Sequence, residues 1–319
     1  AFAHMVRYER RLRPRPIGSS LARYSTNFGD SALVTAAVAG RSGACDLVWV
    51  EGPDADGFLQ GLLTNDVSGL QVGGSCRALL LDNTGHIRAD MRVVRTAAQD
   101  FTLVTGSDDG VQLVALLDEF HFSEDVDILG PEAFACVTLA GRQIGPIEGA
   151  DVVLPGPVPG TVDAIGVDAD AIMTATGAAA LDDGLLEAWR ITAGVPIFGV
   201  DFTSANLVQE AGLVPTTVSF DKGCYLGQET VARVHYRGQV NRRLCGLLLV
   251  APVQVGAALH VGDRHVGVVS SVAASPEFGS IGLAMLRREV GAGDQILVEG
   301  LDHPATAVDL PLQNAHKRA

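Results

Sequence analysis

The sequence lacks any long hydrophobic run. Asp, Arg or Gly interrupts every stretch rich in Ala, Val and Leu, so none approaches the roughly 18 uninterrupted apolar residues that a membrane-spanning helix needs. We therefore expect no role in a membrane. What the chain has instead is 319 residues with 47% hydrophobic side chains, 37 Gly and 14 Pro. That length and composition predict two or three buried cores joined by many turns.

Positive charge is also scarce. The formal net charge is -14 at pH 7, and Lys occurs only at positions 222 and 317. Non-specific nucleic-acid binding depends on Lys and Arg side chains that neutralise phosphates, so the acidic balance argues against it. A local basic cleft for one anion is still compatible with this charge. The preference for Arg over Lys is typical of a GC-rich bacterial coding sequence.

Cysteine is sparse and follows no pattern. The count is odd and no Cys-x-x-Cys pair occurs, which excludes a disulfide framework and a complete zinc or iron–sulfur ligand set. No His-x-x-x-His or clustered carboxylates indicate a protein-held metal. The expected compartment is a reducing cytoplasm. The five cysteines are Cys45, Cys76, Cys136, Cys224 and Cys245.

Helical and strand patterns alternate through the first three quarters of the chain. Apolar residues at helical spacing predict helices over 54–63, 108–120 and 182–193. Short apolar runs predict strands over 47–50, 76–81, 87–95, 100–105, 126–129 and 134–139. This mixture predicts an α+β fold of mostly antiparallel sheet with helices on one side. The segment 141–181 shows little periodicity and is predicted to hold loops and short strands.

The pattern of apolar residues changes near residue 240. Short β-rich segments follow at intervals of about ten residues with turn signals between them, which predicts a small antiparallel barrel or sandwich. The predicted domains are therefore three. They are a disordered basic arm at 1–19 that includes an expression-tag scar, a core at 20–240 of two α+β subdomains divided near 140, and a C-terminal β-barrel at 241–312.

The most informative motif surrounds Cys224. The run Lys222-Gly223-Cys224-Tyr225-Leu226-Gly227-Gln228-Glu229 is a glycine-punctuated loop that is predicted to enter a helix. A cysteine before a helix start, with a lysine two positions away, lies in positive potential that lowers a thiol pKa. Cys224 is thus a candidate reactive thiolate. The alternative is a small buried cysteine between glycines that only shape a turn.

These residues resemble a known family. Lys-Gly-Cys-Tyr-x-Gly-Gln-Glu, followed by Ala232-Arg233, resembles the signature of the YgfZ-type branch of the folate-binding aminomethyltransferase superfamily, which is the glycine-cleavage T-protein superfamily. Arg190-Ile191-x-x-Gly194-x-Pro196 and the run 58–67 also resemble that family. The resemblance spans most of 46–310. It implies a multidomain ring around a central folate channel, closed by the C-terminal antiparallel β-barrel.

The resemblance also implies site residues. Catalytic candidates are Cys224 and Asp90, and the cofactor, tetrahydrofolate, would be bound by Asn65, Asp90, Arg190, Glu210 and Arg233. An excess of three positive charges between 221 and 243 offers a place for a glutamate tail, although a solvated helix face explains any single arginine there equally well. Asp90 by itself is more typical of a solvated or capping residue.

Two departures separate the chain from true aminomethyltransferases. Ala89 replaces the first residue of an adjacent acidic pair of which Asp90 keeps the second, and Thr192 replaces the glutamate of an Arg-x-Glu-Ala-Gly stretch that holds the pterin. A charged acceptor for pterin N–H groups contributes about 1.5–3 kcal/mol, so its loss makes glycine-cleavage activity doubtful.

Three functions remain as hypotheses. The first is an accessory protein that binds tetrahydrofolate and supports assembly or repair of iron–sulfur clusters, with client enzymes or assembly proteins as partners. The second is a folate-dependent one-carbon transferase that works through Asp90. The third is an interaction module whose pocket is vestigial. The Cys224 motif favours the first hypothesis, Asp90 favours the second, and failure to bind any folate would favour the third.

Overall fold

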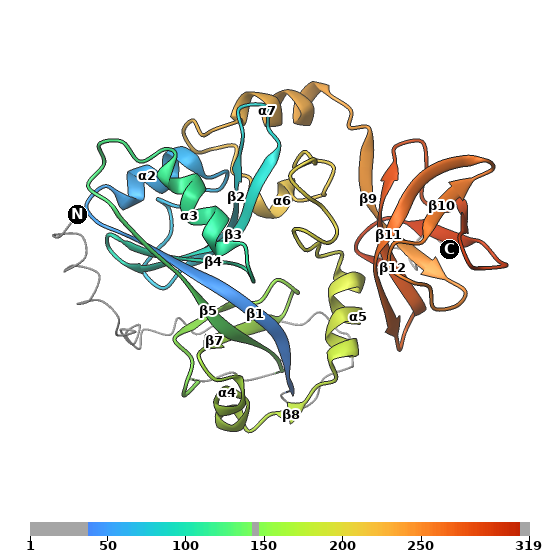
Figure 1. The fold of residues 1–319 in the computed structure, drawn as a ribbon, viewed down its shortest axis with the longest axis horizontal. Coiled ribbons are helices and arrows are strands. Elements are labelled where there is room, and N and C mark those ends of the chain that lie inside the picture. Colours follow the sequence, from blue (N-terminus) through green and yellow to red (C-terminus); the bar gives the residue numbers. More distant parts are fainter. Residues whose placement is uncertain (1–37, 142–146, 313–319) are drawn as a thin grey trace.

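The computed structural model describes residues 38–141 and 147–312. Two bodies lie side by side in Figure 1, an open sheet with its helices and a barrel coloured orange to red. The predicted disordered arm and tag scar at 1–19 lie outside the described residues. Among the described helices, none is both long enough and apolar enough to cross a membrane.

The first body is built on an eight-stranded sheet. Its strands run in the order β2-β3-β4-β1-β5-β7-β6 with antiparallel neighbours, and β8 pairs with β1 in parallel. The strands are β1 (Val38–Glu51), β2 (Ser75–Leu81), β3 (Ile87–Ala97), β4 (Asp100–Gly106), β5 (Asp127–Ala140), β6 (Val152–Pro155), β7 (Thr161–Gly166) and β8 (Ala179–Ala180). The prediction of an α+β, mostly antiparallel layer is confirmed.

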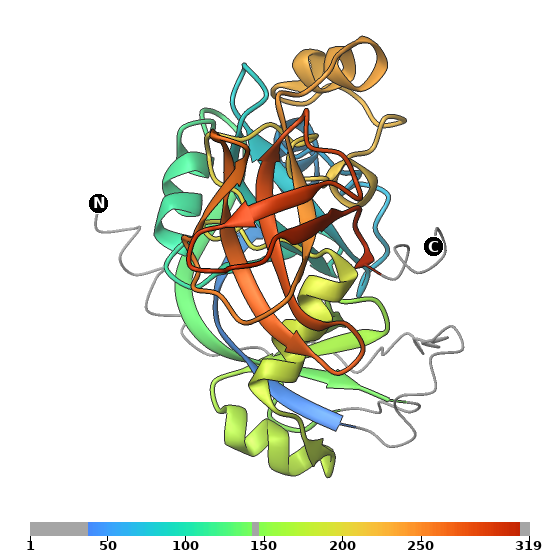
Figure 2. The same ribbon diagram turned by 90° about the vertical axis from the view of Figure 1, so that its right-hand side faces the viewer.

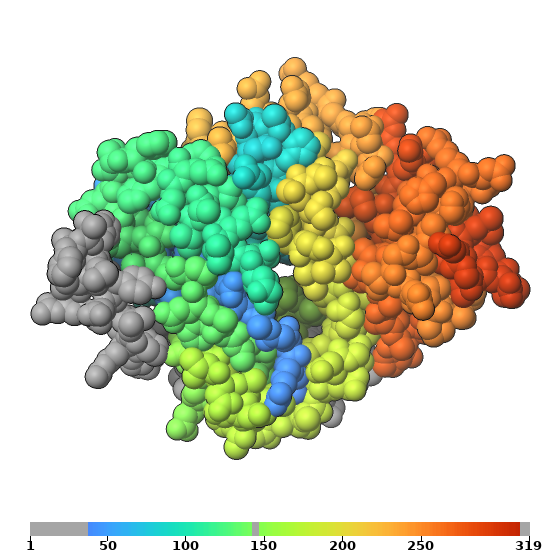
Figure 3. Space-filling view, viewed as in Figure 1, coloured from blue at the N-terminus to red at the C-terminus, as the bar shows by residue number. Residues whose placement is uncertain are grey.

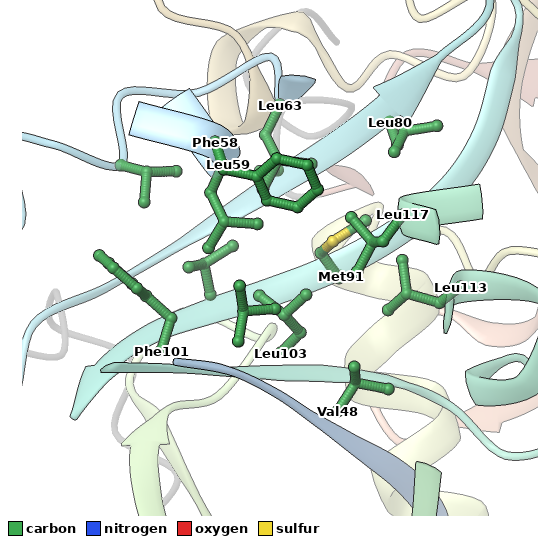
Figure 4. Close-up of a cluster of buried hydrophobic side chains, with 14 of the residues drawn as sticks. Val48, Phe58, Leu59, Leu63, Leu80, Met91, Phe101, Leu103, Leu113 and Leu117 are labelled. Carbon is green, nitrogen blue, oxygen red and sulfur yellow. The ribbon is translucent and has the colours of Figure 1, made fainter. Parts of the chain in front are cut away.

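Two helices, α2 (Ala55–Leu62) and α3 (Gly110–Asp118), pack on one face of this sheet. Both lie where helical spacing of apolar residues predicted them. Phe58 and Leu59 of α2 and Leu113 and Leu117 of α3 meet strand side chains such as Phe101 in one buried cluster (Figure 4). The burial of each such side chain stabilises the fold by roughly 1.5–3 kcal/mol, so this cluster holds the two helices firmly on the sheet.

Three predicted strands were wrong in extent. The runs 126–129 and 134–139 form a single strand, β5, because Gly130 adopts a φ of 100° and the break is absorbed as a register shift against β1. Strand β1 begins at Val38, nine residues before the predicted start, because its glycine-containing segment pairs with β5. The long β1–β5 ladder crosses the middle of the sheet in Figure 1.

The second body is a closed antiparallel barrel with the strand order β10-β11-β12-β9-β14-β13. This confirms the predicted C-terminal barrel. Its interior is a separate buried cluster that includes Cys245, Leu247 and Leu286. The strands are β9 (Arg242–Leu249), β10 (Ala258–Val261), β11 (Arg264–Ser275), β12 (Gly279–Arg287), β13 (Gln295–Val298) and β14 (Ala305–Val308).

Helix α5 (Asp183–Ala193) joins the two bodies. Its Asp182 cap accepts a hydrogen bond from Gly184 N, and Gly194 ends it in the left-handed conformation at φ 70°, as the sequence predicted. Ile191 packs against Leu244 and Leu283 of the barrel. Figure 2 shows the helix lying across the barrel. The remaining helices are α4 (Ala169–Thr176), α6 (Val214–Thr217) and α7 (Gln228–Arg237).

Candidate functional site

A cavity of about 1820 Å³ lies between the sheet, the segment 193–216 and the barrel. Strands β2, β3 and β4 form one wall, and β9 and β14 contribute to the other. Figure 3 shows a hollow at the centre of the molecule, bordered by the blue strand β1 and the yellow segment. Small-molecule sites usually measure about 300–1,000 Å³, so this cavity has room for an extended ligand.

Asp90 lies on the cavity wall in β3, but its carboxylate is already bound. Arg77 of the adjacent strand β2 donates Nε to Oδ1 at 2.9 Å and Nη2 to Oδ2 at 2.5 Å. Only 11% of the Asp90 side chain is exposed. Any role as general base or pterin acceptor therefore has to compete with a bidentate guanidinium. No sequence pattern pointed to Arg77, because its partner Asp90 is 13 residues away on another strand.

Arg190 borders the cavity as a structural hub. Its five N–H donors have protein acceptors: both oxygens of Glu187, Oδ2 of Asp201, the Val195 carbonyl and Oγ of Ser271. The Arg190 side chain is 9% exposed and that of Asp201 is fully buried. No guanidinium N–H is left for a ligand. The prediction that Arg190 binds the cofactor is therefore corrected: it ties α5 to the loop at 195–201 and to β11.

Glu210 and Asp109 also line the cavity. Glu210 Oε2 accepts from Asn206 Nδ2 at 3.0 Å, whereas Oε1 has no hydrogen bond within the described part of the chain. Asp109 occupies the N-cap of α3 without making a cap bond. Burial, followed by the charges of Asp46, Asp90 and Asp108, raises the pKa of Asp109.

Asp109 is the residue that sequence reasoning missed, because an acid before a helix is usually a cap. A carboxyl group with a raised pKa in a cavity is a functional candidate in its own right.

Two predicted ligands stand apart from the cavity lining. Asn65 donates Nδ2 to the Arg77 carbonyl at 2.8 Å and accepts from Asp66 N, so it shapes the turn after α2. Arg233 is exposed on α7. Neither side chain borders the cavity. Of the residues predicted to bind the cofactor, Asp90, Arg190 and Glu210 are the ones that the fold brings together there.

The motif loop packs on the edge of the sheet beside β2. Tyr225 is buried in a cluster with Leu81, Ile87 and Val231. Gly227, the residue before α7, has a φ of 79°, and a Cβ at this position would lie 2.5 Å from the Asp82 carbonyl oxygen. Only glycine fits this backbone and this close approach. Gly227 is thus needed to seat the loop on the hairpin between β2 and β3, whereas a Cβ at Gly223 would meet open space.

Lys222 fastens this loop to α2. Its Nζ donates to the carbonyl oxygens of Gln60, Leu63 and Asn65 at 2.6, 2.5 and 3.0 Å. These carbonyls lie at the negative end of the helix dipole. Burial lowers the pKa of Lys222 to about 8, with the Asp66 charge opposing the change.

The expected role of Lys222 therefore needs correction. Its ammonium donates to carbonyl oxygens at the end of α2, and Asp66 is the carboxylate whose charge acts on it. The sequence had placed it beside Cys224 as an activating charge. Helix α7 also begins at Gln228, four residues after Cys224, instead of directly after it. The thiolate character of Cys224 stays a prediction that this geometry does not explain.

Cys224 differs from the other cysteines in exposure. All five lie in the described part of the chain, and Cys224 alone is exposed. Burial raises the pKa of Cys45, Cys76 and Cys245 to about 11 each and also raises that of Cys136. A partner protein in solution therefore meets Cys224 directly, whereas Cys76 is half-buried in the cavity wall. The alternative of a small buried cysteine at position 224 is wrong.

The buried thiols predict a loss of stability at high pH. Because burial holds the pKa of Cys45 and Cys245 near 11, against about 9 when unfolded, their stabilising effect is complete below pH 9. It is lost as pH rises from 9 to 11, by roughly 3 kcal/mol for each thiol. Urea unfolding at pH 7 and pH 10.5 should show most of this loss, roughly 2 kcal/mol for each thiol, and Cys45→Ala/Cys245→Ala should lose less. Equal losses would contradict it.

Comparison with known proteins gives two matches to family models. The GCVT N-terminal domain matches residues 43–143, and the glycine cleavage T-protein C-terminal barrel domain matches residues 242–313. Among solved structures, an aminomethyltransferase T of the glycine cleavage system from Bartonella henselae aligns with a TM-score of 0.73 at 20% identity, covering 87% of this chain and 86% of that one. This likeness establishes the fold.

Curated relatives are similar at modest identity. A "tRNA-modifying protein YgfZ" of Klebsiella pneumoniae is 29% identical over 62% of this chain and 67% of its own length. An "Iron-sulfur cluster assembly factor IBA57 homolog, mitochondrial" of Mycosarcoma maydis is 30% identical over 68% and 59%. A putative chloroplastic transferase of Arabidopsis thaliana is 31% identical over 44% of this chain, which spans only 32% of that relative.

The sheet and the barrel together define an aminomethyltransferase-like fold. Because the models of both the N-terminal domain and the C-terminal barrel domain match, the chain belongs to the glycine cleavage T-protein superfamily. It fits the YgfZ-type branch of that superfamily.

Proposed function

We propose that this protein binds tetrahydrofolate in its central cavity and supports the assembly or repair of iron–sulfur clusters in client enzymes. The observation that carries the proposal is the single exposed thiol, Cys224, presented by the Lys-Gly-Cys-Tyr motif on a fold that keeps a large cavity. The relatives described as YgfZ and as an iron–sulfur cluster assembly factor support this role.

The lining of the cavity fits a reduced folate. The cavity has room for a pterin with its glutamate tail. Glu210 Oε1 and the Asp109 carboxyl group would accept from pterin N–H groups. At the barrel side, the Arg243 guanidinium borders the cavity, and a tail carboxylate there would share it with Asp309 and the Val290 carbonyl. Bound folate would supply a carrier for a one-carbon group.

Cys224 would act on the cluster side of this function. A single cysteine cannot hold a cluster, since cluster sites need several ligands. Any contact with an iron–sulfur intermediate is therefore transient or shared with a partner protein. Exposure is the property that such sharing needs, because a buried thiol such as Cys245 cannot reach a second chain. The Cys224 thiolate would provide one ligand to cargo that a client or assembly protein provides with the others.

One-carbon transfer through Asp90 is the second candidate. In its favour, Asp90 lies on the cavity wall. Against it, both carboxylate oxygens are bound by Arg77, and neither Ala89 nor Thr192 offers a further acid. The Asp90→Asn variant separates the two candidates. Loss of a one-carbon transfer activity with unchanged folate affinity would favour the transferase.

Glu210 provides the sharpest test of folate binding. The Glu210→Gln variant should bind tetrahydrofolate roughly 10- to 100-fold more weakly, because a hydrogen bond to a charged acceptor contributes about 1.5–3 kcal/mol. Glu229→Gln is the matched control, since Glu229 is exposed on α7 outside the cavity. Calorimetric titration of the purified protein with tetrahydrofolate measures both.

Two results would count against this assignment. If wild-type protein binds tetrahydrofolate only far above cellular folate levels, the folate part of the proposal is lost. If Glu210→Gln and Glu229→Gln bind equally well, Glu210 is not a ligand and Asp109 becomes the remaining acceptor.

A further inference from the structure

Helix α7 carries an exposed basic and aromatic surface outside the folate cavity. Arg233, Tyr236 and Arg237 lie on it, and Arg242 follows at the start of β9; these four residues are called the α7 surface below. Tyr236 is 69% exposed, which is unusual for a large aromatic side chain. The helix forms the top edge of the molecule in both ribbon views (Figures 1 and 2).

The surface is ordered by the packing beneath it. Arg233, Tyr236 and Arg237 stand at positions i, i+3 and i+4, so they share one face of the helix. On the inner side, Val231 is buried in the core. The Tyr236 ring lies 5.8 Å from that of Phe220 and 4.9 Å from that of His235. A braced aromatic side chain loses little conformational freedom when a partner covers it.

The arginines of the surface form no ion pair within the part of the chain that the structure describes. Arg233, Arg237 and Arg242 have no ion pair among residues 38–141 and 147–312, whereas Arg77, Arg92, Arg95, Arg190, Arg243 and Arg264 do. The chain has 37 acidic residues against 23 basic ones. A cluster of unpaired arginines in such an acidic protein attracts a negatively charged partner.

We propose that the α7 surface docks a partner protein through an acidic segment of that partner. Tyrosine and arginine are the residues that dominate binding energy in protein interfaces, and here they alternate on one helix face. Three arginines are few beside the 6–10 phosphate contacts of typical nucleic-acid binders, and the net charge of -14 repels a phosphate backbone.

This docking rests on the proposed function in one respect, because the partner would be a client or assembly protein that meets Cys224. The loop that carries Cys224 leads directly into α7, so a protein covering the helix approaches the exposed thiol. Binding to the helix face itself does not depend on folate.

Photo-crosslinking identifies the partner. Benzoylphenylalanine replaces exposed Gln239 in the full-length protein. The protein that it crosslinks in cells is identified by mass spectrometry and then purified for titration.

Substitutions on the α7 surface should weaken binding of this purified partner. Arg233→Glu/Arg237→Glu should weaken it roughly 30-fold or more at low salt, and Tyr236→Ala by roughly 30-fold. The matched control, Arg264→Glu/Arg287→Glu on the barrel, changes the net charge equally and should shift affinity less than about 2-fold.

Charge exchange completes the test. Lysines in place of the partner's acidic residues should restore binding to Arg233→Glu/Arg237→Glu. An adduct with RNA only, an adduct with a protein that has no acidic segment, or equal weakening by both arginine pairs would overturn the proposal.

Failure here is distinguishable from failure of the proposed function. If Arg233→Glu/Arg237→Glu leaves docking intact while Cys224→Ser abolishes support of iron–sulfur enzymes, the docking surface is wrong and the function stands. The α7 variants should also bind tetrahydrofolate like the wild type, because their side chains lie outside the cavity.

Discussion

Replacing Cys224 by serine is expected to abolish the support of iron–sulfur enzymes in cells that lack the native protein, while folding and folate binding stay intact. The side chain is exposed and lies outside the cavity lining, so the substitution removes a thiol without disturbing packing or the folate site. Serine keeps the size and cannot ligate iron as a thiolate does. Activity of a client enzyme in a complementation assay measures the effect.

The same exposure predicts that one thiol of the native chain is alkylated quickly. Iodoacetamide at pH 7 should modify one cysteine per native chain, Cys224, and the buried cysteines about 100-fold more slowly or less, because they react only when the structure opens locally. Cys245→Ala, in the barrel core and outside the cavity lining, is the matched control and should complement. Full complementation by Cys224→Ser, or alkylation of Cys224 no faster than of the others, means that the motif is structural.

Replacing Arg190 by methionine is expected to destabilise the protein by about 3–5 kcal/mol, which is the cost of leaving a buried charge without its partner. Asp201 would keep hydrogen bonds from Ser270, Ser271 and Ile197 N but lose the only cation that it contacts among the described residues. Because this hub joins α5, the loop at 195–201 and β11, the barrel should also loosen from the sheet. Urea unfolding measures the free energy.

The control for Arg190 is Arg243, whose pair with Asp309 is 30% and 43% exposed. Arg243→Met should cost about 1 kcal/mol or less, as exposed ion pairs do. Removing Arg190 and Asp201 together should cost less than the sum of the two single losses, since the two side chains interact. Similar losses for Arg190→Met and Arg243→Met would show that the hub contributes little.

Local patterns were sufficient for much of the fold. Helices α2, α3 and α5 and the barrel were predicted because each places apolar residues at the period of its own structure, with Asp182 and Gly194 marking the ends of α5. The strands β1 and β5 were predicted too short, since a glycine within a long ladder has the same local signature as a loop.

For the candidate site too, some features followed from the sequence and others only from the tertiary structure. The sequence by itself determined the motif, the five cysteines, the acidic charge and the likeness to one family, because these depend only on residue type and spacing. It could not tell which groups were already bound. Only the tertiary structure decided that Lys222 holds the end of α2, that Arg77 holds Asp90, and that Arg190 has no donor left.

The physical reason is that hydrogen bonding and burial depend on segments distant in the chain. Lys222 and its acceptors are separated by 157 to 162 residues, and Arg190 and Ser271 by 81. Whether an ionisable group is free for chemistry therefore follows from the packing of sheet, helix and barrel. Exposure follows from it as well, and that packing leaves Cys224 as the one exposed thiol in the described part of the chain.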